Sequence, residues 1–420
     1  MRKKLKVPLL AFFFATTTLY LGKQLLGRAA HLGNGGKSAS WQKPTTWTPA
    51  THGAILPAAN ITEYLEAILA TKPSAMPNLE CPAIKHGRYD SIKGSSTSGP
   101  QIQYFFALNL REALPVLPRL IGSLVEVIRF LGPRYCVLSI VEGNSPDGTA
   151  DVLAALRSTF DKLGLLYYFA SSTINPGTGD RVKHLAELRN MALAPLLEVP
   201  GGMATQETTV VFLNDVVACA EDILELVYQK NAINADMTCA MDWTYVGRDP
   251  TFYDVWVART INGDSFFDIP ADGNWNSAWN LFWNAEDTRR RFSAQQPFQV
   301  FSCWNGATAF TAAPILLNKV HFRAPSAADN ECGQGEPQLF CKDLWFHGYR
   351  KIAVVPSINL EYSVEKGKMI KEAKGFTSNN VLSQNLSDDE IDWQLEPPEK
   401  VRCMSSWENQ YWVPWNETLK

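Results

Sequence analysis

The chain has 420 residues, 46% of them hydrophobic, so it can bury either one large core or two to three smaller ones. Its 39 basic and 42 acidic side chains leave a formal net charge of -3, and no long basic stripe runs along it. This pattern lacks the dense positive surface that neutralises a phosphate backbone, which argues against nucleic acid as a partner.

The N-terminus predicts a membrane anchor. A basic segment over residues 2–6 precedes an apolar run from Val7 to Gly22. A spanning helix needs about 17 to 25 residues, so this run suits a thin early-secretory membrane. Positive charge before the run predicts a cytoplasmic N-terminus at residues 1–26 and a luminal remainder, as in a single-pass type II protein of the Golgi or another secretory membrane. The alternative is a cleaved signal peptide with a small-residue site at residues 28–30.

Residues 27–90 are predicted to form a stem. The first part is rich in Gly, Ser, Thr, Pro and Ala without sustained periodicity, and a short helix is expected over residues 61–71. Acceptor triplets for N-glycosylation begin at Asn60, Asn385 and Asn416. They agree with a glycoprotein that leaves the cytosol.

The eight cysteines are an even number, which is consistent with disulfides in an oxidising compartment, although 105 full pairings are possible. The absence of a Cys-x-x-Cys pair argues against a structural zinc site. Cys136, Cys219 and Cys239 lie in apolar surroundings, and we expect them to be buried free thiols.

Between residues 91 and 375, strand-like apolar runs alternate with amphipathic helices. The predicted strands are 102–108, 135–141, 165–170 and 210–213, and the predicted helices are 117–128, 147–163, 181–197 and 219–228. This alternation is typical of an α/β fold with a mostly parallel sheet. Beyond residue 240 the long connections are rich in Trp, Asp and Asn, as a substrate face would be. Residues 376–420 are predicted to be an acidic tail.

The segment Thr209–Val216 is an apolar run that ends in Asn214 and Asp215. In α/β domains, ligands collect outside the carboxyl ends of parallel strands, so this exit predicts a binding site with Asp215 as a metal ligand. Magnesium or manganese would suit its oxygen ligand better than zinc. The alternative is that both side chains only cap the following helix or form an Asx turn.

Two further segments supply donor-binding candidates. Glu142 and Asp147 follow the second predicted strand, where they could bond a ribose or a base, although Asp147 could equally cap a helix. Arg189 and Asn190 lie in a predicted helix, and the arginine could hold a phosphate through its fork of donors. Alternatively, Arg189 pairs with a neighbouring carboxylate such as Glu187.

Seven segments carry a family resemblance. They are YFFALNL (104–110), SIVEGNSPDGT (139–149), LRNMA (188–192), VFLNDV (211–216), CWNG (303–306), LFCKDLW (339–345) and VVPS (354–357). Their order resembles that of the fungal capsule-associated mannosyltransferases, the cryptococcal α-1,3-mannosyltransferase type. The resemblance covers about residues 100–365 and implies a single Rossmann-like glycosyltransferase domain of the GT-A type at residues 91–375.

The resemblance also implies the reaction. A retaining enzyme of this family would move mannose from GDP-mannose to a sugar hydroxyl of a mannose-containing glycan, with an α-1,3 linkage and a divalent cation, Mn²⁺ or Mg²⁺. The usual Asp-x-Asp metal motif appears here as Leu213-Asn214-Asp215, without its first carboxylate. One protein carboxylate together with the diphosphate can still hold a metal.

Catalytic and sugar contacts are expected in the second half of the chain. Glu336 and Asp343 lie where the resemblance predicts a carboxylate near the reacting carbon. Asp242, after another apolar run, is a candidate for contacts to donor sugar hydroxyls, and Trp304 and Asn305 are candidates for acceptor contacts. Flat aromatic faces suited to sugars are also offered by Trp243, Trp275 and Trp345, although most tryptophans belong to cores.

Three alternatives remain open. The same fold could use another nucleotide sugar, such as UDP-xylose or UDP-galactose. The missing carboxylate of the metal motif could instead mark a non-catalytic, lectin-like or scaffold subunit of a glycan-synthesis complex. A secreted glycosidase is disfavoured because it would have little use for a retained anchor.

Overall fold

The computed structural model describes residues 55–70, 74–95, 101–199, 202–382, 384 and 390–419. The strands are β1 Ile102–Leu110, β2 Cys136–Glu142, β3 Leu166–Ser171, β4 Ala204–Leu213, β5 Met237–Val246, β6 Asp249–Phe252, β7 Arg259–Thr260, β8 Phe298–Ser302, β9 Ala307–Thr311, β10 Ile352–Leu360, β11 Lys400–Met404 and β12 Gln410–Pro414. The helices are α1 Ala58–Leu69, α2 His86–Tyr89, α3 Leu117–Leu131, α4 Thr149–Ala155, α5 Arg157–Leu163, α6 Arg181–Glu198, α7 Ala220–Ala232, α8 Glu286–Ser293, α9 Ala313–Leu316, α10 Glu336–Phe346, α11 Val364–Lys374 and α12 Thr377–Asn380.

One sheet runs through the described part of the chain in the order β3-β2-β1-β4-β9-β5-β10-β8-β7, and β6 pairs with β5 outside this path. Strands β1 to β4 are parallel to one another, as are β5 and β10. Strand β9 lies antiparallel between β4 and β5, so β4 and β5 still point the same way. The sheet is therefore mostly parallel, and the carboxyl ends of β1, β2, β4, β5 and β10 lie at one edge.

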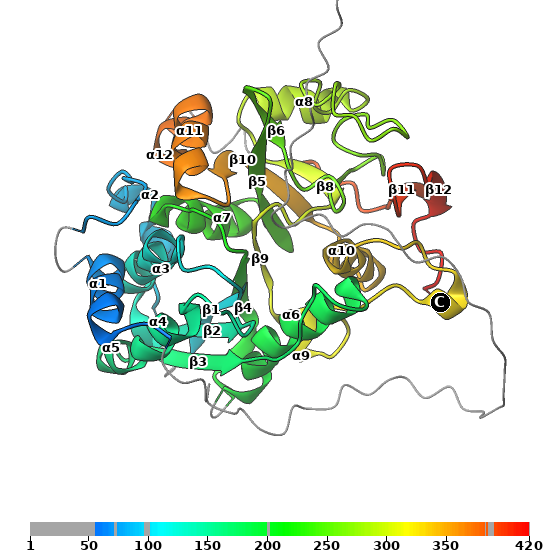
Figure 1. Cartoon of the computed structure of the whole chain (residues 1–420). Coiled ribbons are helices and arrows are strands. Elements are labelled where there is room, and N and C mark those ends of the chain that lie inside the picture. Colours follow the sequence, from blue (N-terminus) through cyan, green and yellow to red (C-terminus); the bar gives the residue numbers. More distant parts are fainter. Residues whose placement is uncertain are drawn as a thin grey trace, which may run out of the picture.

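Helices cover both faces of this sheet (Figure 1). Alternate residues of a strand point to opposite faces, and β1 follows this rule: Phe106 and Leu108 pack in one core with α3 and α7, while Phe105 and Ala107 pack in the other with α6 and α10. Burial on both faces explains why the strands read as continuous apolar runs rather than alternating ones.

The predicted strands and helices before residue 232 are confirmed, with one difference. The helix predicted over 147–163 is two helices, α4 and α5, which meet at Leu156. After residue 240 the sequence shows no regular alternation of strands and helices, yet this region forms β6 to β10. Most of these strands are short and separated by long loops, so their periodicity is hard to recognise. The α/β class with a mostly parallel sheet is confirmed.

The described part of the predicted stem, within residues 55–90, packs on the main domain through several contacts. Helix α1 contacts α3, Arg88 forms an ion pair with Glu225 at 2.7 Å, and Cys81 forms a disulfide with Cys219. The expectation of free thiols at Cys219 and Cys239 is wrong, because Cys239 pairs with Cys303. Cys136 is a buried free thiol, as expected. Apolar surroundings did not separate the two cases, since a buried disulfide has the same neighbours.

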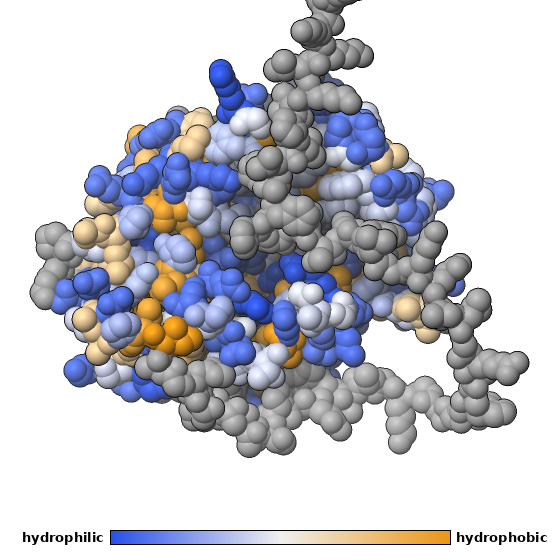
Figure 2. Space-filling view, viewed as in Figure 1, coloured by the Kyte–Doolittle hydropathy of each residue, from blue (hydrophilic) through white to orange (hydrophobic). Residues whose placement is uncertain are grey.

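The predicted anchor lies outside the described residues. Within them, no helix combines the length and the apolar character that a bilayer crossing requires. At the other end, β11 and β12 form an antiparallel hairpin, and the disulfide between Cys332 and Cys403 ties it to the segment before α10. Figure 2 shows that the visible face is largely hydrophilic, with scattered hydrophobic patches.

Candidate active site

The carboxyl ends of three parallel strands bring polar side chains together. Asn214 and Asp215 follow β4, Asp242 lies in the last part of β5, and Tyr362 follows β10. In the paired register, Leu360 of β10 faces Asp242, and the Tyr362 hydroxyl donates a hydrogen bond of 2.6 Å to Oδ2 of Asp242. Parallel strand direction therefore brings these residues to one edge of the sheet from distant parts of the chain.

The segment Cys303–Gly306 closes the site between β8 and β9. Gly306 has a φ of +82°, and a Cβ there would come within 3.1 Å of the Val216 side chain and 3.3 Å of Asp242. Its carbonyl accepts a hydrogen bond of 2.9 Å from the backbone N–H of Asn214. Only glycine allows this conformation and this close approach together. The segment thus holds the exits of β4 and β5 at a fixed separation.

A further carboxylate, Asp254, enters from the loop after β6. Its Oδ2 accepts a hydrogen bond of 2.9 Å from the backbone N–H of Asn305. Asp254 interacts electrostatically with Asp242, Arg189 and Glu336. It is partly buried, whereas Asp242 is fully buried.

Negative charge on these carboxyl groups is unfavourable, as their raised pKa values indicate. Burial and then repulsion by Asp254 raise the pKa of Asp242 well above its ordinary value. Burial raises the pKa of Asp254 to about 6, against the opposing effects of the Asn305 N–H and of Arg189. Burial likewise raises the pKa of Asp215. Desolvation and like charge both favour the neutral acid, so a cation in this site would be stabilised.

Arg189 lies near Asp215 and Asp254, among aromatic rings. Its guanidinium carbon is 4.5 Å from the centre of the Trp304 ring and 5.2 Å from that of Phe212. Its Nε donates a hydrogen bond of 2.8 Å to Oε1 of Glu336, and both side chains are at least nine-tenths buried. Arg189 thus pairs with Glu336 rather than with Glu187.

Four of the predicted site residues lie away from the carboxylates at the strand ends and bond other parts of the protein. Glu142, at the end of β2, accepts hydrogen bonds from the backbone N–H groups of Asn144 and Ser145. By strand register it is level with Asp215 but two strands away, roughly 10 Å. Asp147 accepts a hydrogen bond of 3.0 Å from the Thr149 N–H, but it is not the cap of α4, whose N-cap residue is Gly148 and which has no side-chain cap.

The other two are on helices. Asn190 bonds the backbone of Phe322 twice, through its Nδ2 and its Oδ1. Asp343 accepts two hydrogen bonds from Arg323, at 2.7 and 2.9 Å, within an ion-pair network that includes Glu331. Both sets of contacts stabilise the segment after α9, and Asp343 is not in contact with the carboxylates at the strand ends.

The acceptor candidates Trp304 and Asn305 have no free face. Trp304 is 1% exposed, and its indole N–H donates to Oδ1 of Asn214 at 3.1 Å. The Asn305 amide bonds the carbonyl of Ala240 at 2.9 Å. These two side chains bond protein groups in the interior, so the structure gives no surface on them for an acceptor. Trp243 and Trp345 are buried too, whereas Trp275 is partly exposed.

The site also fits a cation in part. Oδ1 of Asp242 is buried and has no hydrogen-bond partner, and burial raises the pKa of Asp215 even though Arg189 lowers it. Nowhere in the described ranges do three or more His, Cys, Asp or Glu side chains form a group able to hold a metal ion. A cation here would therefore need oxygen ligands from a bound molecule as well.

Sequence reasoning missed Asp254 and Tyr362. Tyr362 follows the apolar strand β10 as Asp215 follows β4, so the strand-exit signal that identified Asp215 could have found it. Asp254 follows the four-residue strand β6. A strand this short leaves no readable periodicity, so nothing local marks Asp254.

Comparison with known proteins gives two matches that cover most of the chain. A family model described as cryptococcal mannosyltransferase 1 matches residues 103–343. The α-1,3-mannosyltransferase CMT1 of Cryptococcus neoformans var. neoformans serotype D is 38% identical over 359 residues, which are 79% of this chain and 75% of that protein. The range of the family model includes Arg189, Asp215, Asp242, Asp254 and Glu336.

Solved structures show weaker likeness. The S. aureus TarS 1-349 structure has a TM-score of 0.36 and 13% identity over 69% of this chain and 68% of that chain. The mannosyltransferase PcManGT from Pyrobaculum calidifontis, in complex with GDP-Man and Mn²⁺, has a TM-score of 0.34 and 13% identity over 72% of this chain and 67% of that chain. Both TM-scores are below 0.5, so neither likeness supports a statement about this chain.

Proposed function

Since this chain belongs to the cryptococcal mannosyltransferase family and is therefore a glycosyltransferase, we propose that it moves mannose from GDP-mannose to a sugar hydroxyl with retention of configuration. The related enzyme's name specifies an α-1,3 linkage, and we propose the same linkage here. The observation that carries the proposal is the set of carboxylates at the carboxyl edge of the parallel strands: Asp254 interacts with Asp242, and Asp215 and Asp254 each interact with Arg189.

Asp215 is the proposed metal ligand. It lies at the strand exit with an elevated pKa, and the neighbouring Oδ1 of Asp242 has no partner. When bound, Mn²⁺ or Mg²⁺ would offset the negative charge of the diphosphate leaving group. Donor oxygens would complete the coordination, since the described protein ligands are too few.

We assign the carboxylate that faces the reacting sugar to Asp254 rather than to Glu336 or Asp343. The latter two are held in ion pairs with Arg189 and Arg323, whereas Asp254 is partly exposed and accepts a hydrogen bond from the Asn305 N–H. An ionised Asp254 would stabilise positive charge that develops on the anomeric carbon. Arg189 is then a positioning residue below the site.

In the proposed reaction, the bond from the anomeric carbon to the phosphate oxygen breaks and its electron pair leaves with the diphosphate. The acceptor oxygen forms the new bond on the same face, which retains the configuration. Its proton passes to the departing diphosphate. Asp242, the predicted contact to donor sugar hydroxyls, is fully buried, so a donor would reach its unpartnered Oδ1 only if neighbouring side chains moved aside.

The proposed location is the lumen of the Golgi or another secretory compartment, with a type II anchor at residues 1–26. Three disulfides within the described residues support an oxidising compartment. Asn60 and Asn416, which begin two of the acceptor triplets, are both exposed. Glycosylation at these positions, detected by mass spectrometry and removed by an endoglycosidase, would support luminal exposure, and unmodified asparagines in protein made by its native host would contradict it.

The test of function is donor turnover by the full chain purified in mild detergent. GDP-mannose, UDP-xylose and UDP-galactose are each incubated with an α-1,3-linked mannobiose acceptor, with and without Mn²⁺, and nucleotide diphosphate release is measured. We expect release from GDP-mannose only, dependent on the metal, and an α-linked product by NMR. Turnover of a UDP-sugar alone would replace the donor assignment, and a β-linked product would exclude retention.

A pair of variants separates an enzyme from a scaffold. Asp215→Asn removes the proposed metal ligand, and Asp147→Asn changes a carboxylate that bonds Thr149 at the start of α4 and the Leu114 N–H after β1. We expect turnover to fall by about 100-fold or more in the first and to stay within a few-fold in the second. Equal turnover by both folded variants would contradict the role of Asp215, and absence of turnover by the wild-type protein with every donor would favour a scaffold.

A further inference from the structure

Three tryptophan side chains form a partly exposed surface that begins next to the active site. Trp256 and Trp407 have ring centres 4.0 Å apart, and Trp407 and Trp275 have ring centres 6.3 Å apart. All three are partly exposed, whereas Trp243, Trp304 and Trp345 are buried. We name Trp256, Trp275 and Trp407 the tryptophan surface.

This surface adjoins Asp254 along the chain. Trp256 follows Asp254 by two residues, so their Cα atoms are at most about 7 Å apart. The backbone N–H of Ala258 bonds the carbonyl of Asp254 at 3.1 Å, which folds the intervening residues into a turn. The tryptophan surface therefore begins within one turn of chain from the carboxylate that we assign to the reacting sugar.

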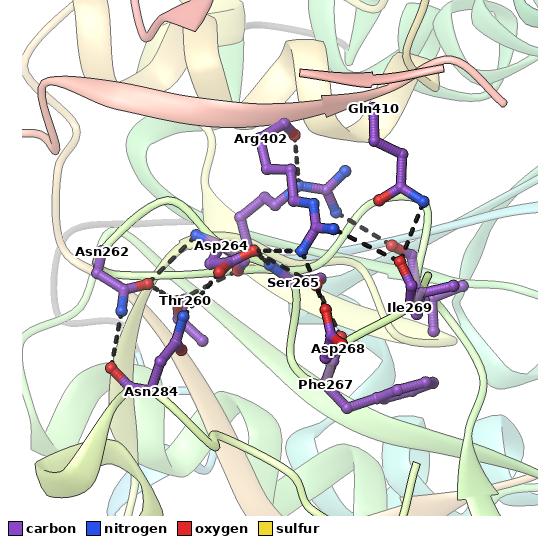
Figure 3. Close-up of polar contacts among 12 residues, drawn as sticks. Thr260, Asn262, Asp264, Ser265, Phe267, Asp268, Ile269, Asn284, Arg402 and Gln410 are labelled. Atoms are coloured by element: carbon purple, nitrogen blue, oxygen red, sulfur yellow. Dashed lines mark hydrogen bonds and ion pairs between the residues drawn. The ribbon is translucent and has the colours of Figure 1, made fainter. Parts of the chain in front are cut away.

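Polar contacts join the segment around Asp264 to the β11–β12 hairpin (Figure 3). Arg402 of β11 bonds Asp264 at 3.0 Å, and Gln410 of β12 bonds the carbonyl of Ile269 at 3.1 Å. Oδ2 of Asp264 also accepts from Asn284 at 2.7 Å. These contacts fix the loop over residues 261–285, which carries Trp275, against the β11–β12 hairpin, which carries Trp407.

Close packing places the Trp407 ring against a backbone turn. Gly273 has a φ of +71°, and a Cβ there would come within 2.8 Å of the Trp407 ring. Trp275 also packs on Phe267, with ring centres 5.6 Å apart. The rings are therefore ordered while part of their surface stays exposed, which lowers the entropy lost when a ligand stacks on them.

The chemistry around the surface favours a neutral, hydroxyl-rich ligand. Between residues 260 and 284 the chain contains acidic residues and no basic one, which disfavours anionic lipid or phosphate-rich partners. Exposed amides at Asn276 and Asn409 offer both donors and acceptors. Sugar rings combine an apolar C–H face with hydroxyls, so they match aromatic faces flanked by amides.

We propose that the tryptophan surface binds the glycan acceptor as an oligosaccharide, with its reactive end directed toward Asp254. This inference deepens the proposed function and rests on it for the direction of the acceptor. Three partly exposed rings lie side by side, so affinity should rise with the number of sugars. The acceptor is therefore an extended mannose oligomer rather than a single sugar.

The test measures binding without any donor. The full chain is titrated by calorimetry with α-1,3-linked mannobiose and mannotetraose and with cellotetraose as a control sugar. Trp407→Leu and Trp275→Leu keep apolar volume but remove the flat ring. Trp393→Leu is the matched control, because Trp393 is also partly exposed but bonds the carbonyl of Ile233, close to the opposite edge of the sheet. Circular dichroism and melting temperature confirm that each variant is folded.

We expect the wild-type protein to bind mannotetraose more tightly than mannobiose and cellotetraose. Trp407→Leu and Trp275→Leu should each raise the Kd for mannotetraose about tenfold, and Trp393→Leu should leave it unchanged. Equal affinities in all folded variants, or wild-type binding to anionic lipid vesicles but not to mannotetraose, would overturn the proposal. Ring-dependent binding without any donor turnover would sustain this inference while removing the proposed transferase function, so the two failures are distinguishable.

Discussion

The Nε atom of Arg189 lies 2.8 Å from Oε1 of Glu336, and each side chain is about one-tenth exposed or less. A guanidinium buried among aromatic rings requires a compensating anion, and Glu336 supplies it. Glu336, which the family resemblance suggested as catalytic, is thus held by Arg189. The positive charge of Arg189, which was expected to bind a phosphate, is already neutralised by Glu336.

The first prediction concerns this pair. Glu336→Gln keeps an acceptor oxygen for Arg189, whereas Glu336→Ala leaves the buried guanidinium unpaired. We expect the alanine variant to lose about 3 to 5 kcal/mol of unfolding free energy and the glutamine variant distinctly less, measured by chemical denaturation. Turnover by Glu336→Gln should stay within about tenfold of wild type. A loss of several hundred-fold with unchanged stability would instead make Glu336 the catalytic carboxylate.

The second prediction uses the pKa of Asp254, which burial raises from 3.8 to about 6. Between these values the folded protein holds a proton that the unfolded chain has released, so the free energy of unfolding decreases as pH rises through this window. At pH 7.5 the ionised group still destabilises the fold. Asp254→Asn should therefore melt at a higher temperature than the wild type at pH 7.5, with a smaller difference at pH 4.5.

The same variant tests the role of Asp254 in turnover. If the ionised carboxylate faces the reacting sugar, wild-type activity should fall as pH drops below about 6, and Asp254→Asn should lose about 100-fold or more at every pH. An active Asp254→Asn variant with the wild-type pH profile would show that this carboxylate does not take part.

The third prediction compares two glycines with positive φ. Gly306 has a φ of +82° and close neighbours in Val216 and Asp242, while Gly164 has a φ of +73° and no atom within 4 Å of the position that a Cβ would take. Gly164→Ala should cost about 1 to 2 kcal/mol from the backbone alone and leave turnover intact. Gly306→Ala should cost more and also lower turnover, because it displaces the exits of β4 and β5. Equal stability and turnover in the two variants would show that the close approach at Gly306 is not required.

The fourth prediction concerns the disulfide between Cys81 and Cys219, which spans 138 residues of sequence. Replacing both cysteines by serine should lower the unfolding free energy by about 2 to 5 kcal/mol, since the unfolded chain gains freedom. Turnover should fall as well, because Cys219 immediately precedes α7 and lies shortly after Asp215 in the chain. Cys136→Ser, at a buried free thiol, is the control.

Deletion of residues 1–90 tests the same contact from the other side. That truncation removes Cys81 together with α1 and Arg88, which pack on α3 and Glu225. We expect the shortened chain to unfold at a lower temperature than a chain that begins at residue 55. Identical melting temperatures would mean that the described part of the predicted stem adds no stability.

The order of strands and helices up to α7 followed from local sequence, because hydrophobic periodicity and helix-start signals act over a few residues. The exit of β4 at Asp215 was visible for the same reason, and the ordered motifs identified the family. The prediction of a single helix over 147–163 is wrong only at Leu156, where one helix ends and a second begins.

The partners of the site residues were decided by tertiary structure alone. The insertion of β9 between β4 and β5, the approach of Asp254 to Asp242, and the pairing of Arg189 with Glu336 all depend on contacts that local sequence does not reveal. The exposure of Trp275 and the burial of Trp304 likewise depend on what packs against each ring. Residue type sets what a side chain can bond, but strand register and long-range packing determine whether that bond goes to a ligand or to the protein itself.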